Sequence, residues 1–185
     1  LSEWLADFAD NKTVVLTTKP SANAAGFSYF LNTANGNISK ILGNIAGLTI
    51  LVSPDKKLAL YAESAGSSFR TKIYDLVSNR AADFALQTLS EKCVWSQIEP
   101  TVVFCAAPKA ATACSYPDCW YQGRVAFSDD IWKINIATGE TNRLISPETF
   151  INKSIDVINP LLNENENFLL FMNKTDLSLW VLDIR

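Results

Sequence analysis

The sequence LVSPDKKLALYA, residues 51–62, contains two short apolar runs joined by a polar turn. Pro54 presets the φ angle that a tight turn requires, and Asp55 is a common residue in the same kind of turn. Apolar runs on both sides of such a turn are typical of paired β-strands. The stretch therefore predicts an antiparallel hairpin with strands over 48–52 and 58–63.

The apolar triplet that opens the second strand of this hairpin recurs along the chain. Its copies begin at residues 14, 58, 102 and 168, and they read Val14-Val15-Leu16, Leu58-Ala59-Leu60, Val102-Val103-Phe104 and Phe168-Leu169-Leu170. The first two steps are each 44 residues and the third is 66, so about 22 residues are inserted in the third unit. A repeat of about 44 residues that holds several strands is the signature of one β-propeller blade.

A chain of 185 residues therefore predicts an all-β fold, a β-propeller with about four blades in a single domain or segment, 1–185. We expect the blades at 1–44, 45–88, 89–146 and 147–185. The fourth unit ends after its third strand, and propeller blades usually have four. We expect additional blades or a second copy, as a homodimer, to complete the propeller. One piece, 81–86, is equally compatible with a strand and with the start of a helix.

Three pieces carry a resemblance to a known family: LVSPDKKLALYA, DDIWKINIATGET and LSLWVLDIR, which begin at residues 51, 129 and 177. They resemble the TolB-type, WD40-like (PD40-like) propeller repeats, in which a Ser-Pro-Asp turn and a Thr-Gly-Glu turn flank the strands. Here Ser-Pro-Asp is intact only in the second unit and Thr-Gly-Glu only at 138–140. The resemblance implies a fold far more strongly than a function.

Composition and charge argue against several classes of partner. The net charge is −3 with a pI near 5.0, and the basic residues are scattered, so no surface for nucleic acid is expected. The longest apolar stretch, 41–52, is too short and too interrupted to span a membrane. The sequence begins at Leu1 rather than Met, so we expect any signal peptide or anchor to lie upstream.

The sequence contains no His, which excludes the usual Ser-His-Asp and Cys-His mechanisms. We therefore expect no catalytic residue, no cofactor and no enzyme activity. Asp129-Asp130 could be mistaken for an acid/base pair of an active site. We interpret the two residues as polar turn residues that are solvated at a strand edge. A Ca²⁺ site at 163–167 is a weaker alternative to a solvated turn there.

The cysteines form two local groups. Cys93 and Cys105 lie at mirrored positions of one predicted hairpin, within disulfide reach, and Cys114 and Cys119 bracket a short loop that a second disulfide would close. Two disulfides favour an extracytoplasmic location, secreted or at the cell surface. A zinc site made by three of these thiolates is an alternative, but the spacing and the absence of His argue against a metal.

The insertion, roughly 107–126, differs in character from the rest of the repeat. It contains Tyr116, Trp120, Tyr121 and Arg124, residue types that are enriched at binding surfaces. The resemblance implies that the loop between the second and third strands lies on the propeller face that receives ligands. These residues are therefore candidates for a binding patch; alternatively, the aromatics pack the insertion against its own blade.

Together these observations predict a non-enzymatic, extracytoplasmic module for binding and scaffolding. It would contact a protein or peptide, and less readily a glycan, through one propeller face and the insertion. The alternative is that the chain is the gating propeller of a larger hydrolase similar to prolyl oligopeptidase. That alternative predicts a Gly-x-Ser-x-Gly segment and a His beyond residue 185.

Overall fold

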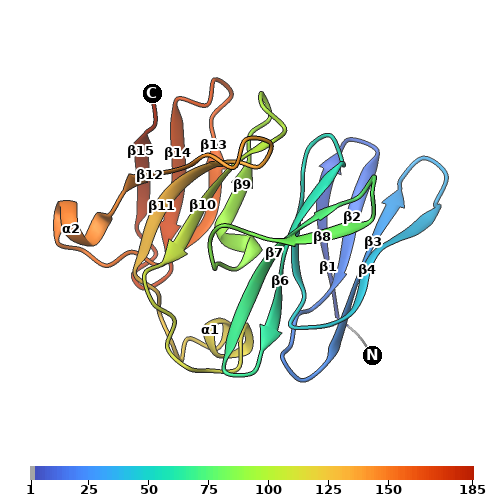
Figure 1. Cartoon of the computed structure of the whole chain (residues 1–185), viewed down its shortest axis with the longest axis horizontal. Coiled ribbons are helices and arrows are strands. Elements are labelled where there is room, and N and C mark those ends of the chain that lie inside the picture. Colours follow the sequence, from blue (N-terminus) through green and yellow to red (C-terminus); the bar gives the residue numbers. More distant parts are fainter. Residues whose placement is uncertain (1–2) are drawn as a thin grey trace.

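The structure is a computed structural model that describes residues 3–185, and it contains four antiparallel β-sheets (Figure 1). The first two sheets, which we call blades 1 and 2, come from the first half of the chain. Blade 1 contains β1 (Trp4–Asp10), β2 (Thr13–Thr18), β3 (Ala25–Asn32) and β4 (Ile38–Ala46). Blade 2 contains β5 (Thr49–Val52), β6 (Leu58–Ala65), β7 (Ser68–Asp75) and β8 (Arg80–Asp83).

The other two sheets, blades 3 and 4, follow the same plan. A 3-10 turn, η1 (Ser90–Lys92), precedes blade 3, and helix α2 (Pro147–Ile151) follows it. Blade 3 contains β9 (Cys93–Trp95), β10 (Val102–Pro108), β11 (Asp129–Asn135) and β12 (Thr141–Ile145). Blade 4 contains β13 (Val157–Leu162), β14 (Phe168–Asn173) and β15 (Leu179–Asp183).

In every sheet each strand pairs with its neighbour in the sequence, which is the meander of a propeller blade. The predicted all-β propeller with four blades is confirmed. Blade 4 has three strands among the described residues, as the pattern predicts, and the 81–86 segment contributes strand β8 rather than a helix. Helix α2 was not predicted, and β13 ends at Leu162, directly before the turn at 163–167.

The hairpin that suggested the fold has the expected turn. Ser53 N–H donates to the carbonyl of Leu58 at 2.8 Å, and the Leu58 N–H donates back to Ser53 Oγ at 2.9 Å. Ser53 Oγ donates to Asp55 at 2.7 Å, so the polar turn residues satisfy one another. Across the strands Leu51 lies opposite Leu60, which places both side chains on one face of blade 2.

Apolar side chains fill the spaces between successive blades. Leu60 of blade 2 packs with Trp95, Val103 and Ile134 of blade 3. The opposite face of blade 3, which includes Phe104 and Ile131, packs against blade 4 through a larger group: Ile155, Val157, Leu169 and Phe171. In Figure 1 blade 4 lies at one end of the molecule and blade 1 at the other.

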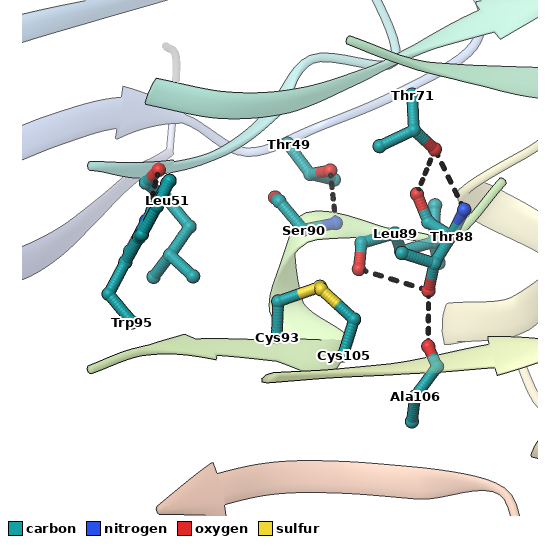
Figure 2. Close-up of a disulfide and its surroundings, with 10 residues drawn as sticks. All are labelled: Thr49, Leu51, Thr71, Thr88, Leu89, Ser90, Cys93, Trp95, Cys105 and Ala106. Carbon is teal, nitrogen blue, oxygen red and sulfur yellow. Dashed lines mark hydrogen bonds between the residues drawn. A yellow bond between two sulfur atoms is a disulfide. The ribbon is translucent and has the colours of Figure 1, made fainter. Parts of the chain in front are cut away.

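The connection between blades 2 and 3 is hydrogen-bonded to both of them (Figure 2). Thr88 exchanges hydrogen bonds with Thr71 of blade 2 and donates to the carbonyl of Ala106 of blade 3. Ser90 N–H donates to Thr49 at 3.3 Å. Beside this connection the Cys93–Cys105 disulfide joins β9 to β10, where the two residues are direct cross-strand partners. The predicted pairing is confirmed.

Candidate functional site

The insertion connects β10 to β11 and carries the short helix α1 (Asp118–Tyr121). It lies at the same end of the propeller as the β2–β3, β6–β7 and β14–β15 connections, and we call this end the insertion face. In Figure 1 this is the lower end of the strands, where α1 is drawn. The opposite end, which we call the turn face, carries the tight hairpin turns such as 53–57 and 163–167.

The second disulfide, Cys114–Cys119, closes a ring within the insertion, as predicted. Cys119 N–H also donates to the carbonyl of Ser115 at 3.0 Å, and the Arg124 N–H donates to the carbonyl of Cys119 at 2.9 Å. The two disulfides use all four cysteines, so the thiolates that a zinc site would need are absent. Among residues 3–185 no group of His, Cys, Asp and Glu has the arrangement of a metal site.

The insertion belongs to blade 3 and is hydrogen-bonded to each of the other three blades. Asp118 accepts a hydrogen bond from the Ala22 N–H of blade 1 at 2.6 Å. The carbonyl of Tyr116 accepts one from Ser64 of blade 2. Lys174 of blade 4 donates to the carbonyl of Trp120 at 2.6 Å. A segment of blade 3 therefore ties all four blades together across the insertion face.

Gly47, between blades 1 and 2, is part of this close packing. Its φ is +67°, and an added Cβ would lie 2.6 Å from Ser64 Oγ and 3.0 Å from the carbonyl oxygen of Tyr116. A residue with a Cβ would be strained at this φ and would also clash with these two atoms, so the position requires glycine. The chain passes beneath the insertion at this point because it has no side chain there.

The four predicted binding residues have different environments. Tyr116 is 0% exposed and Trp120 is 3% exposed, and they pack with Phe69 and Phe127. The Tyr116 ring meets Phe69 edge to face with centroids 4.9 Å apart. Tyr121 is half-buried and Arg124 is exposed. For Tyr116 and Trp120 the structure supports the packing alternative, and of the four only Tyr121 and Arg124 present surface to a partner.

A buried charge cluster lies directly behind Trp120. Lys92 Nζ is 2.8 Å from Asp129 Oδ2 and 2.6 Å from Asp156 Oδ1, and the side chains of all three are fully buried. Lys92 also donates to the carbonyl of Val157 at 2.8 Å, which satisfies its third proton. The indole N–H of Trp120 donates to Asp156 Oδ2 at 2.9 Å. One cation therefore serves two buried carboxylates.

This cluster corrects our interpretation of Asp129-Asp130 as a solvated strand edge. Asp129 and Asp130 are 1% and 5% exposed, because the insertion and the start of blade 4 cover the beginning of β11. Burial raises the pKa of Asp129 to about 6, and the Lys92 ammonium limits that rise. Asp129 Oδ1 has no hydrogen-bond partner among the described residues. No local pattern predicted this cluster, because its members come from three separate segments.

A cavity of about 210 Å³ lies between blades 1 and 2. Its walls are largely apolar and come from β1, β2 and β5, and Glu91 of η1 also contributes to them. Tyr121 Oη donates to Glu91 Oε1 at 2.6 Å, which links α1 to this wall. Burial raises the pKa of Glu91, and the hydrogen bond from Tyr121 opposes that rise. Burial and the adjacent carboxylate also raise the pKa of Tyr121.

None of the described helices has the length and apolar character of a transmembrane segment. No protein-family model and no curated protein matches the sequence. Solved structures do match. A putative TolB from Agrobacterium tumefaciens is 14% identical with a TM-score of 0.65, and the match covers 100% of this chain and 58% of that one. TolB from Acinetobacter baumannii is 12% identical with a TM-score of 0.63, and the match covers 98% and 44%.

The propeller domain of the Trilobed protease from Pyrococcus furiosus is also similar, at 12% identity and a TM-score of 0.56, over 98% of this chain and 54% of that one. This chain thus spans about half of the length of the TolB structures that it matches. At such low identity the likeness concerns the fold alone. On that level the resemblance stated from the sequence is confirmed: this chain has the TolB-like β-propeller fold.

Proposed function

We propose that this chain is a non-enzymatic module that binds a protein or peptide partner on its insertion face. The observation that carries the proposal is the fixation of the insertion by all four blades. Hydrogen bonds from Ala22, Ser64 and Lys174 hold a loop that most proteins would leave mobile. A rigid loop loses little conformational entropy when it binds, so it is well suited to recognition.

The exposed part of the insertion forms the proposed contact surface. Residues 109–113 and 122–124 are exposed, and they surround the buried aromatic residues. Lys109 and Arg124 are the charged residues of this surface, and Lys109 is paired with Glu148 at 2.8 Å. Arg124 lies three residues after Tyr121, whose exposed edge adds to the surface. Arg and Tyr are the residue types that most often dominate the energy of protein interfaces.

The two disulfides support an extracytoplasmic location for this activity. Disulfides persist where the surroundings are oxidising, and they are rare in reducing compartments. The Cys114–Cys119 bond holds the proposed contact surface itself. The hydrolase-gating alternative is supported by the likeness to the propeller domain of the Trilobed protease, and that likeness concerns the fold.

Photo-crosslinking in cells that make this protein tests the proposal. A benzoylphenylalanine at Gln122 on the insertion face is compared with one at Ser78, which is also exposed and lies on the turn face. We expect defined protein adducts from position 122 and few from position 78. Adding Arg124→Glu should weaken the interaction at least about tenfold, since the loss of an interfacial Arg commonly costs 1.4 kcal/mol or more. Equal adducts at both positions would contradict the proposal.

A further inference from the structure

The cavity between blades 1 and 2 combines apolar walls with carboxylate groups. Leu5, Val15 and Ile50 supply apolar walls, and Glu91 supplies a carboxylate. Its volume of about 210 Å³ exceeds that of an engineered apolar cavity, about 150 Å³, that accommodates benzene. The cavity is therefore large enough for a short aliphatic chain.

The strand register places a second carboxylate at the same cavity. Asp7 lies opposite Val15 in the β1–β2 pairing, and Leu5 lies opposite Thr17. Because cross-strand partners share a face, the Asp7 side chain is on the face of blade 1 that Val15 and Thr17 present to the cavity. Asp7 is exposed, so it forms the solvent side of the wall.

Among residues 3–185, no Lys or Arg lines the cavity to neutralise these two acids. The nearest cation in sequence, Lys92, points away into the buried cluster with Asp129 and Asp156. Tyr121 occupies Glu91 Oε1, while Glu91 Oε2 accepts no hydrogen bond from the part of the chain that the structure describes. An apolar pocket with a free carboxylate oxygen complements a cation on an apolar stem.

We propose that this cavity binds an ammonium group carried on an aliphatic chain, with Glu91 and Asp7 as its charge partners. The apolar stem would lie against Val15 and Ile50, and the ammonium would donate to Glu91 Oε2. Two sources share this chemistry, a lysine side chain of a partner protein and a free aliphatic amine. The proposal does not depend on the proposed function, because the cavity and the exposed insertion surface are separate features.

Calorimetric titration with defined probes tests this proposal on the whole chain. The probes are N-acetyl-lysine-methylamide, 1,4-diaminobutane, and butan-1-ol as a neutral control of similar length. We expect at least one of the two amines to bind and butan-1-ol not to bind. Binding of the lysine derivative alone would identify a partner side chain as the source, whereas binding of the diamine alone would identify a free amine.

Variants connect binding to the two carboxylates. Glu91→Gln keeps an acceptor for Tyr121 but removes the charge, and it should weaken amine binding about tenfold or more. Asp7→Asn, at an exposed position that should not affect folding, should weaken it by a smaller factor. Glu164→Gln, an exposed acid on the turn face, is the matched control and should change nothing.

Two results would overturn the proposal: binding of neither amine, or binding that both Glu91→Gln and Asp7→Asn leave unchanged. Such failure is separable from failure of the proposed function, because the crosslinking at Gln122 does not use this cavity. Adducts at Gln122 without amine binding would retain the proposed function and reject the amine site. Amine binding without adducts at Gln122 would retain the amine site and reject the proposed function.

Discussion

Large apolar side chains have opposite environments in the insertion and on the outer faces of blades 1 and 4. In the insertion Tyr116 and Trp120 are buried, although a loop rich in aromatics suggests a contact surface. On the outer faces, Phe8 of β1 is 72% exposed and Leu179 of β15 is 69% exposed, although both lie in regular strands. The comparison shows that neighbouring blades, rather than residue type, decide which aromatic groups are buried.

Each outer face carries several apolar side chains close together. On blade 1, Trp4, Leu16, Tyr29 and Ile38 line an open hollow on the side opposite to blade 2. On blade 4, cross-strand pairing puts Leu170 beside Val181 and Met172 beside Leu179: these residues share one face. Faces of this kind are buried between blades elsewhere in the same molecule, as the blade 3 and blade 4 interface shows.

The largest effect is expected when an aromatic residue is removed from the insertion. Trp120→Ala should lower the free energy of unfolding by about 3–5 kcal/mol, because it leaves a cavity and removes the indole donor to Asp156. Trp4→Ala, at a tryptophan that is 48% exposed, is the matched control and should cost far less. Urea unfolding followed by circular dichroism measures both. Similar losses of unfolding free energy in the two variants would contradict the difference in burial between the insertion and the outer face.

The two disulfides should differ in their contribution to stability. The Cys93–Cys105 bond closes 12 residues and the Cys114–Cys119 bond closes 5. Loop-closure entropy then predicts about 3 kcal/mol for the first bond and about 2 kcal/mol for the second. Paired Cys→Ala variants, measured by urea unfolding, check the order. The second pair should in addition loosen the insertion, which hydrogen exchange at the Arg124 amide would detect; unchanged protection there would contradict its role as a clamp.

The buried charge cluster predicts a dependence of stability on pH. The pKa of Asp129 is about 6 in the folded chain and 3.8 as the reference value for the unfolded one. The folded state therefore binds more protons between these values. The stability that Asp129 contributes is fully present below about pH 3.8 and is lost as the pH rises through 6, with a slope of at most about 1.4 kcal/mol per pH unit.

Comparison with Asp129→Asn isolates this contribution, since the other acids are common to both proteins. The stability of the wild type relative to the variant should fall between about pH 4 and 6 and should be constant above about pH 7. Urea titrations over this range measure the difference. A difference that is constant or that rises with pH would show that Lys92 keeps Asp129 ionised throughout.

The smallest effects are expected on the outer faces. Phe8→Ser and Leu179→Ser should each change the free energy of unfolding by about 0.5 kcal/mol or less, because both side chains already contact solvent. Sedimentation velocity should show the same molecular mass for wild type and variants. A larger loss of stability, or a shift in mass, would mean that a second copy of the chain covers these faces in solution.

Much of the fold was predictable because it is encoded locally. The turn at Ser53-Pro54-Asp55 and the apolar runs on both sides of it specify a hairpin without reference to other blades. The Cys93–Cys105 pairing followed from the same reasoning, because cross-strand register within one hairpin places the two residues opposite each other. Helix α2 was missed because its five residues are too few for a helical pattern to be detectable.

The candidate site was much less predictable. The aromatic and Arg content of the insertion drew attention to it, but it did not distinguish packing from contact. The partners of the insertion are Ala22 and Lys174, which lie in connections, and Ser64, which lies near the end of β6; none belongs to a pattern in the sequence. Glu91 is one of 19 acids, and only its position beside the cavity sets it apart.

The sequence by itself determined the strands, their order within each blade, the repeat of the blades and both disulfide pairings, because each depends on contacts between residues that are close in the chain. The tertiary structure alone decided where the insertion lies, which carboxylates are buried around Lys92 and which apolar faces stay open. Those outcomes depend on how separate blades pack against one another, and the free energy of that packing is shared among residues that are distant in the chain and leave no local pattern.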